Sequence, residues 1–362
     1  MLLRNKAPLR FLINRMQRNC GKLLALTASF LLLWSIMDAQ TKQSSEVRPG
    51  LPDKQKFEGT DDQGARTSPS SQRTSSRSDD FRLRVESNLV VLHATVLDKN
   101  SKPITDLGEG DFRVFENDVE QKLKVFKRED IPVSVGILVD NSGSMRDKRR
   151  GVNAAALKFV QTSNPNDEVF IVNFNDEAYL DADFTDNMKL LQDGLEKIDA
   201  RGGTALYDAL SMSLKYLSER GTRDKKVLLA ITDGEDNASR LSLEQTVKAV
   251  QHSNAVIYTV GLLGDEGPRS TRRAKRALQE FSKASGGAVY FPRNPDEVIT
   301  IATQISNDIR NQFVLAYTPS NLARDGSFRK VEVRVSSKKY GKLSVRTRNG
   351  YYASSEPLPS PS

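Results

Sequence analysis

Three short segments of the chain carry the kinds of oxygen that bind a small divalent cation: Asp140, Ser142 and Ser144 in the first, Thr204 in the second, and Asp233 in the third. Carboxylates and hydroxyls are hard ligands suited to Mg²⁺ or Mn²⁺. The acid and the two hydroxyls of the first segment stand at every second position, so one turn can direct them to one point. These residues predict a metal site if the fold brings the three segments together.

Each of these residues also has an ordinary structural explanation. Ser142 and Ser144 are residue types that cap helices, and Asp233 is a type that binds turn amides. We favour metal binding because the five residues occur together.

An enzymatic use of the same acid is a second alternative. Asp140 at the end of a strand, with Mg²⁺ beside it, suits a phosphatase that uses an aspartyl nucleophile. Such enzymes normally have a second acid two residues later, where this chain has Ser142. The chain also lacks a Gly-x-x-x-x-Gly-Lys loop and a Gly-x-Ser-x-Gly elbow.

The elements that must position these residues alternate between strand and helix over residues 131–310. Ser134 to Val139 is a continuous apolar run, which is typical of a strand buried on both faces. We predict the following further strands and helices in chain order: helix 149–162, strand 169–173, edge segment 179–184, helix 187–198, helix 206–217, strand 227–231, helix 243–252, strand 255–261, helix 272–283, strand 288–291 and helix 295–310. This order predicts an α/β fold with a doubly wound, mostly parallel, Rossmann-like sheet.

Strand-like alternation flanks this segment on both sides. We predict strands over 90–97, 112–116 and 123–126, the last two bracketing the turn Asn117-Asp118, and over 313–317, 331–335 and 343–347. The flanks, 81–130 and 311–353, are expected to pair with each other in a small β-sandwich-like unit. Residues 354–362 form a tail.

The first eighty residues predict export. A basic segment is followed by fifteen mostly apolar residues, 23–37, which end at Asp38-Ala39-Gln40. This order is typical of an export signal over residues 1–39, and the run is shorter than the roughly 17–25 residues of a spanning helix. We expect cleavage after Ala39 and a periplasmic or extracellular location. The alternative is an uncleaved signal anchor, which would supply the membrane contact. Residues 40–80 are almost devoid of apolar side chains and predict a disordered linker.

Composition excludes several classes of function. The chain has 362 residues, a single cysteine and two histidines, which argues against disulfides, cysteine-ligated zinc and histidine-rich metal sites. Residues 1–39 hold six basic residues against one acid and carry +5 of the net charge of +8. The remaining +3 is too small to indicate a nucleic-acid-binding face.

The pattern Asp140-x-Ser142-x-Ser144, followed by Thr204 and by Asp233 in a Thr-Asp-Gly context, resembles the metal-ion-dependent adhesion site of von Willebrand factor type A domains. The resemblance covers about residues 130–310. With the export signal, the β segment before the Ser-Val-Gly-Ile-Leu-Val-Asp strand and the ending Asn349-Gly350-Tyr351-Tyr352, the wider chain resembles the exported von Willebrand-related bacterial proteins of the acidobacterial type.

The resemblance implies a binding mechanism. In such sites the two serines ligate the metal directly, the threonine does so directly or through water, and the aspartates act chiefly through waters. One coordination position stays open for an Asp or Glu carboxylate of a protein partner. The function expected is therefore an exported, non-enzymatic, metal-dependent adhesion or scaffold module. The alternatives are the phosphatase described above and a metal-free structural module.

Overall fold

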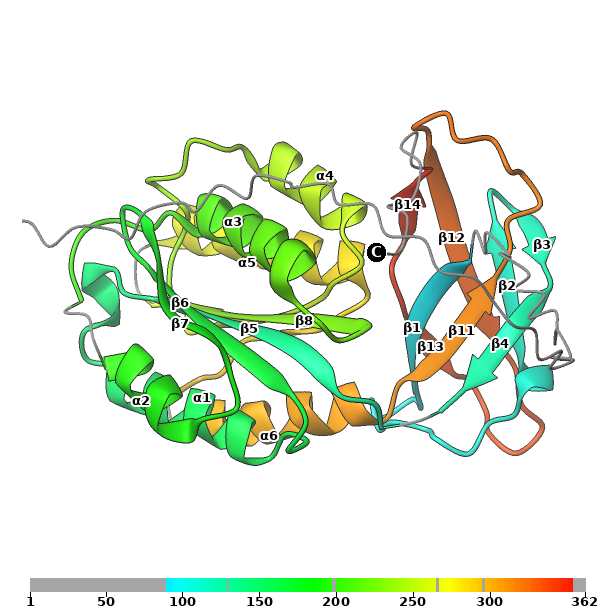
Figure 1. Ribbon diagram of the computed structural model, residues 1–362, viewed down its shortest axis with the longest axis horizontal. Coiled ribbons are helices and arrows are strands. Elements are labelled where there is room, and N and C mark those ends of the chain that lie inside the picture. Colours follow the sequence, from blue (N-terminus) through cyan, green and yellow to red (C-terminus); the bar gives the residue numbers. More distant parts are fainter. Residues whose placement is uncertain (1–88, 129, 197–199, 265–266, 295–296, 354–362) are drawn as a thin grey trace, which may run out of the picture. The chain divides into compact units, whose positions relative to one another are not determined.

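Two four-stranded antiparallel sheets and one six-stranded, mostly parallel sheet make up the fold (Figure 1). The computed structural model describes residues 89–353 except 129, 197–199, 265–266 and 295–296. The predicted export signal, linker and tail lie outside the described residues. Within the described part, no helix is both long enough and apolar enough to cross a membrane.

The six-stranded sheet has the strand order β10-β9-β8-β5-β6-β7. Its strands are β5 (Val133–Asp140), β6 (Glu168–Phe174), β7 (Ala178–Thr185), β8 (Lys225–Thr232), β9 (Val256–Gly261) and β10 (Val289–Tyr290). All neighbours pair in parallel except β7, which is antiparallel to β6. The order confirms the predicted doubly wound sheet, and every residue of β5 is buried, as its apolar run predicts.

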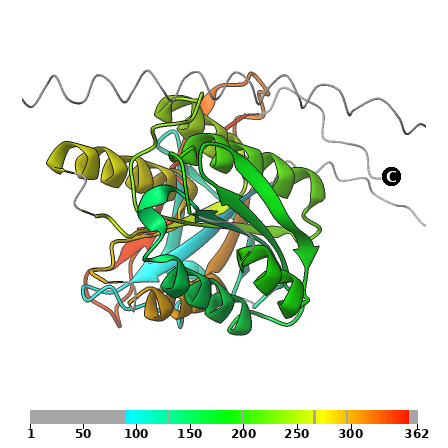
Figure 2. The ribbon, with the colours of Figure 1, turned by 90° about the vertical axis from the view of Figure 1, so that its left-hand side faces the viewer.

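Helices cover both faces of this sheet (Figures 1 and 2). One face packs against α1 (Arg149–Gln161), α2 (Met188–Glu196) and α6 (Glu297–Arg310), and the other against α3 (Leu206–Arg220), α4 (Leu243–His252) and α5 (Pro268–Ser285). Helix α5 begins four residues before the predicted start, because Pro268 occupies the first turn, where its missing N–H costs nothing.

The two smaller sheets are built from both flanks of the chain. Their strand orders are β13-β1-β11-β4 and β14-β12-β2-β3. The strands are β1 (Val90–Leu97), β2 (Phe112–Glu116), β3 (Val119–Gln121), β4 (Leu123–Lys127), β11 (Phe313–Tyr317), β12 (Phe328–Val335), β13 (Ser344–Arg346) and β14 (Gly350–Tyr352). β1 and β4 pair with β11, and β2 pairs with β12, so the predicted pairing between the flanks is confirmed. An apolar core that includes Leu92, Val114 and Leu315 joins the two sheets.

One pairing within the first flank differs from the prediction. Phe112–Glu116 does not form a hairpin with Leu123–Lys127; it pairs with Val119–Gln121 across a two-residue turn. Asn117 and Asp118 both have positive φ there, as a tight hairpin turn requires. The chain then crosses to the other sheet, where β4 pairs with β11.

A buried polar contact joins the β-sandwich to the α/β segment. Asp308, on α6, accepts hydrogen bonds from the Tyr258 hydroxyl at 2.7 Å and from Arg346 of β13 at 2.8 Å. The sandwich is therefore fixed to the end of the sheet at which β5 begins, and the opposite edge remains for the loops that carry Asp140 and Asp233.

Candidate metal centre

The segments that carry Asp140 and Asp233 meet where the strand order of the six-stranded sheet reverses. β5 and β8 are neighbours although β6 and β7 lie between them in the chain. Asp140 is the last residue of β5, and Asp233 directly follows β8. Open α/β sheets bind ligands at this reversal, outside the carboxyl ends of the strands.

Both oxygens of the Asp140 carboxylate are held by hydrogen bonds. Oδ1 accepts from the Ser142 backbone N–H at 2.8 Å, and Oδ2 accepts from the Thr232 hydroxyl at 2.5 Å. The side chain is inaccessible to solvent. Burial raises the pKa of Asp140 to about 6 and the charge of Asp233 acts in the same direction, whereas the bonds from Thr232 and Ser142 lower it.

A chain of hydroxyl contacts connects the first segment to the third. The Ser142 and Ser144 hydroxyl oxygens are 3.2 Å apart, and the Ser144 hydroxyl donates to Asp233 Oδ1 at 2.9 Å. Ser142 stands at the start of a 3₁₀ turn, Gly143–Met145, and its side chain makes no capping hydrogen bond. The helix-cap explanation of this serine is therefore not supported.

The loop that carries Thr204 contacts the segment of Ser142 and Ser144 through its backbone. The Gly143 N–H donates to the Gly202 carbonyl at 3.2 Å. Gly202 has a φ of +75°, and a Cβ there would come within 2.1 Å of Asp176 Oδ2, so glycine is required. Thr204 is buried, and its N–H donates to Asn237 Oδ1 at 2.8 Å.

The structure thus brings all three segments to one edge of the sheet. It places Asp140, Ser142, Ser144 and Asp233 in one network of contacts and seats Thr204 on the adjoining loop. Within the described residues, no group of three or more His, Cys, Asp or Glu side chains could hold a metal. A cation at this edge would therefore depend on hydroxyl oxygens beside the two carboxylates.

Sequence reasoning missed three side chains at this edge. Thr232 donates to Asp140, as described above. Lys148 pairs with Asp233, with Nζ and Oδ2 2.5 Å apart. Asn141 is fully buried, and neither polar atom of its amide has a hydrogen-bond partner. The hydroxyl of Thr232, at the end of a buried strand, was a usable signal, but no sequence pattern marked Lys148 or Asn141.

The two acids that follow Asp233 have other partners. Glu235 pairs with Arg273 of α5. Asp236 accepts hydrogen bonds from the Tyr207 and Ser239 N–H groups and the Ser239 hydroxyl, and thereby connects the loop after β8 to the start of α3. Both acids therefore support the loop.

The chain is similar to known proteins over its α/β segment. The family model described as von Willebrand factor type A domain matches residues 135–235. No curated protein matches the chain.

Several solved structures are distantly similar. An aerotolerance-related membrane protein from Bacteroides fragilis is 20% identical over 48% of this chain and 98% of its own, with a TM-score of 0.40. The vWF domain of the type V pili tip protein Mfa5 from Porphyromonas gingivalis is 14% identical over 50% of this chain and 95% of its own, with a TM-score of 0.41. A von Willebrand factor type A protein from Catenulispora acidiphila is 12% identical over 75% of this chain and 76% of its own, with a TM-score of 0.43.

Proposed function

The chain carries a von Willebrand factor type A domain, matched over residues 135–235, and we propose that this domain binds a protein partner through a bound Mg²⁺ or Mn²⁺. Five residues would hold the ion: Asp140, Ser142, Ser144, Thr204 and Asp233. We further propose that the protein is exported and non-enzymatic, as the leader sequence and the wider resemblance to exported bacterial von Willebrand-related proteins imply.

The observation that carries the proposal is the contact chain from Ser142 through Ser144 to Asp233. It gathers hydroxyl and carboxylate oxygens from two loops at the reversal of strand order. Two more observations suit a cation there. The Lys148 ammonium already lies 2.5 Å from Asp233, so the edge attracts positive charge, and the buried Asn141 amide lacks partners.

The residues of this chain would set the chemistry of the site. When bound, the ion supplies a positive charge with a free coordination position for a carboxylate of the partner. Thr232 and the Ser142 N–H hold Asp140 in one orientation, and the 3₁₀ turn presents Ser144 at the exposed rim.

The same geometry argues against Asp140 as a nucleophile. Both of its oxygens accept hydrogen bonds and the side chain has no solvent-accessible surface. In-line attack on a phosphoryl group needs a carboxylate oxygen that can approach the phosphorus atom. A binding role therefore fits this carboxylate better than the aspartyl phosphatase alternative.

Calorimetric titration of Mg²⁺ and Mn²⁺ into the full chain is the first test, and we expect saturable binding at one site. Asp140→Ala should weaken it by about 10–100-fold, the usual cost of losing a group that supports metal ligands. Ser142→Ala/Ser144→Ala should abolish it. Asp193→Asn, which alters an exposed carboxylate on α2, is the matched control.

Three results would contradict the proposal. No ion binding by the wild-type chain would favour the metal-free module, and binding by both site variants equal to that of the wild type would show that the ion binds elsewhere. Turnover of an aryl phosphate that disappears in Asp140→Asn would instead favour the phosphatase. Thermal unfolding of each variant separates loss of the site from loss of the fold.

A second prediction concerns Lys148. Its ammonium and a metal ion would compete for Asp233 Oδ2, since the Lys148 side chain is 25% exposed and that of Asp233 only 1% exposed. We expect Lys148→Met to bind Mg²⁺ about three- to tenfold more tightly, which corresponds to roughly 1 kcal/mol for one partly buried ion pair. Lys283→Met, on the exposed side of α5, is the control. Unchanged or weaker binding in Lys148→Met would show that Lys148 orients Asp233 and does not compete with the ion.

A further inference from the structure

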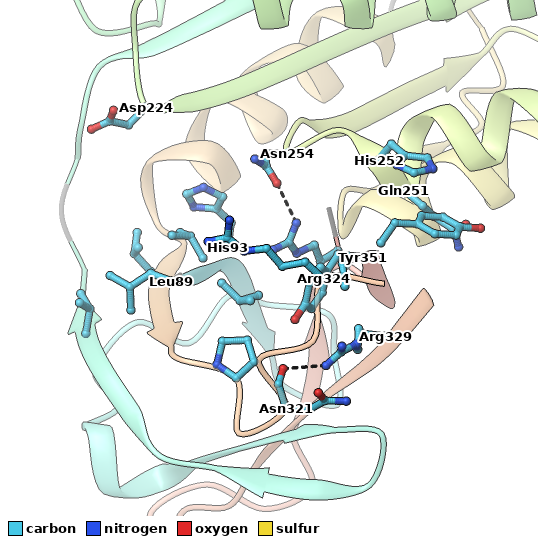
Figure 3. A pocket seen from close by; sticks show the side chains of 18 of the residues that line it. Leu89, His93, Asp224, Gln251, His252, Asn254, Asn321, Arg324, Arg329 and Tyr351 are labelled. Carbon is cyan, nitrogen blue, oxygen red and sulfur yellow. Dashed lines mark hydrogen bonds between the residues drawn. The ribbon is translucent and has the colours of Figure 1, made fainter. Parts of the chain in front are cut away.

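A second site lies far from Asp140 in the sequence, against the outer face of the sheet β13-β1-β11-β4. Here β1, β14, the end of α4 and the loop 319–324 surround a cavity of about 800 Å³ (Figure 3). Alternate residues of β1 point away from the sandwich core, and two of them, Val91 and His93, line the cavity. The volume lies within the range of about 300–1,000 Å³ that is usual for sites of small organic ligands.

Arg348 is a partly buried cation in this cavity, and its charge has no counter-ion among the described residues. Its Nη1 donates to Asn254 Oδ1 at 2.9 Å, and its guanidinium lies 5.4 Å from the centre of the Tyr351 ring. Its Nε is buried without a hydrogen-bond partner, and within the described ranges no ion pair involves Arg348. Burial lowers the pKa of Arg348, and Tyr317 and Tyr351 act in the opposite direction.

Three other buried or partly buried arginines of the protein are compensated by acids. Arg329 pairs with Glu116 at 3.1 Å, Arg346 pairs with Asp308 at 2.8 Å, and Arg310 pairs with Asp167. A buried charge without a partner is costly, so proteins normally supply one. Arg348 lacks such an acid within the described part of the chain, and a bound anion would supply the missing negative charge.

His93 is a second unsatisfied group in the same cavity. Its Nδ1 is buried and has no hydrogen-bond partner. Burial, together with the charges of Lys225 and Arg348, lowers the pKa of His93 to about 3, so the imidazole is neutral at pH 7. A neutral imidazole nitrogen can donate or accept one hydrogen bond.

The remaining lining is mostly apolar at the mouth and carries one acid. Val91 is 42% exposed and Leu322 is 62% exposed. Asp224 is the one carboxylate among the described lining residues, and it is solvent-exposed. Lys127 and Arg324 also line the cavity, and each already interacts with another group. One uncompensated guanidinium beside apolar surface matches a ligand with one negative charge and an apolar body.

We propose that this cavity binds a small organic monocarboxylate, with its carboxylate on Arg348 and His93 and its apolar body against Val91 and Leu322. A carboxylate is planar and can accept two parallel hydrogen bonds from a guanidinium, which suits the open donors of Arg348. The site is independent of the metal centre, because none of its residues belongs to the loops after β5 and β8.

The test uses decanoate as the probe and 1-decanol as its uncharged match, titrated calorimetrically into the full chain with a chelator present. We expect one-site binding of decanoate, and decanol at least about tenfold weaker, as loss of one charge-assisted contact implies. Arg348→Met should reduce the affinity for decanoate to that for decanol and leave decanol binding unchanged.

A second pair of variants guards against a folding defect in Arg348→Met. Leu322→Glu places a negative charge at the exposed mouth and should weaken decanoate binding severalfold, whereas Leu322→Gln should not. Equal affinity for decanoate and decanol, no binding of decanoate, or decanoate binding unchanged in Arg348→Met would each overturn the proposal.

Discussion

Replacing Glu116 by alanine is expected to lower the free energy of unfolding by about 3–5 kcal/mol, the usual cost of removing one partner of a buried ion pair. Glu116 is 3% exposed and Arg329 is 1% exposed, and they pair between neighbouring strands β2 and β12. The other oxygen of Glu116 accepts hydrogen bonds from the Tyr317 and Tyr351 hydroxyls, both at 2.8 Å. Alanine would leave the guanidinium with only the exposed carboxylate of Asp325, 3.8 Å away, as counter-ion, and both hydroxyls without this acceptor.

Denaturant unfolding, monitored by circular dichroism, measures this effect. Glu116→Gln keeps an acceptor for the hydroxyls and should lose less than the alanine variant. Glu120→Ala is the matched control, because the Glu120 side chain is 54% exposed and lies 4.0 Å from that of Arg113, which is 70% exposed. We expect this substitution to lower the free energy of unfolding by less than about 0.5 kcal/mol. A loss below about 1 kcal/mol in Glu116→Ala would show that water or neighbouring groups compensate Arg329.

Apolar periodicity was enough to predict the α/β segment from the sequence. Strands such as Val133–Asp140 are buried on both faces and read as continuous apolar runs, and the helices between them have strong amphipathic patterns. The strand order then placed the ends of β5 and β8 side by side, so the meeting of Asp140 with Asp233 followed from topology. The pairing of the β flanks was also predictable, because neither flank alone could bury its apolar faces.

Other features depend on tertiary packing that no local pattern encodes. The hairpin was wrongly assigned because Val119–Gln121 has one buried residue in three and gives no alternation signal, whereas Leu123–Lys127 does. Lys148 reaches the candidate metal centre only through its contact with Asp233, 85 residues away in the sequence. Arg348 looks like a surface residue of an alternating strand, but contacts with Asn254 and Tyr351 partly shield it from solvent.

Stability is expected to rise with pH in the alkaline range because of Lys225, the first residue of β8. The residue is 3% exposed, and its ammonium donates to the Ile309 carbonyl at 2.5 Å. Burial, helped by the charge of Arg310, lowers its pKa from 10.5 to about 7. Between pH 7 and 10.5 the unfolded chain therefore keeps a proton that the native protein has released, and raising the pH favours the native state.

The size of this effect follows from the shift. At 1.36 kcal/mol per pH unit, Lys225 contributes a rise of up to roughly 4 kcal/mol in the free energy of unfolding between pH 7 and 10. The measurement is urea unfolding at several pH values for the wild type and for Lys225→Met. The wild-type value should rise relative to that of Lys225→Met across this range, so that their difference isolates Lys225 from other titrating groups.

The neighbouring residue supplies the control. Lys226→Met changes a lysine whose ammonium donates to the Ser218 carbonyl at 3.4 Å in an exposed position. The free energy of unfolding of this variant, plotted against pH, should run parallel to that of the wild type. Parallel curves for Lys225→Met as well would show that Lys225 stays protonated in the native state. The bond to Ile309 and the acids around it, Asp308, Asp130 and Asp167, would then outweigh desolvation. In that case Lys225→Met should be destabilising at every pH, because it would remove a hydrogen-bonded charge that joins β8 to the end of α6.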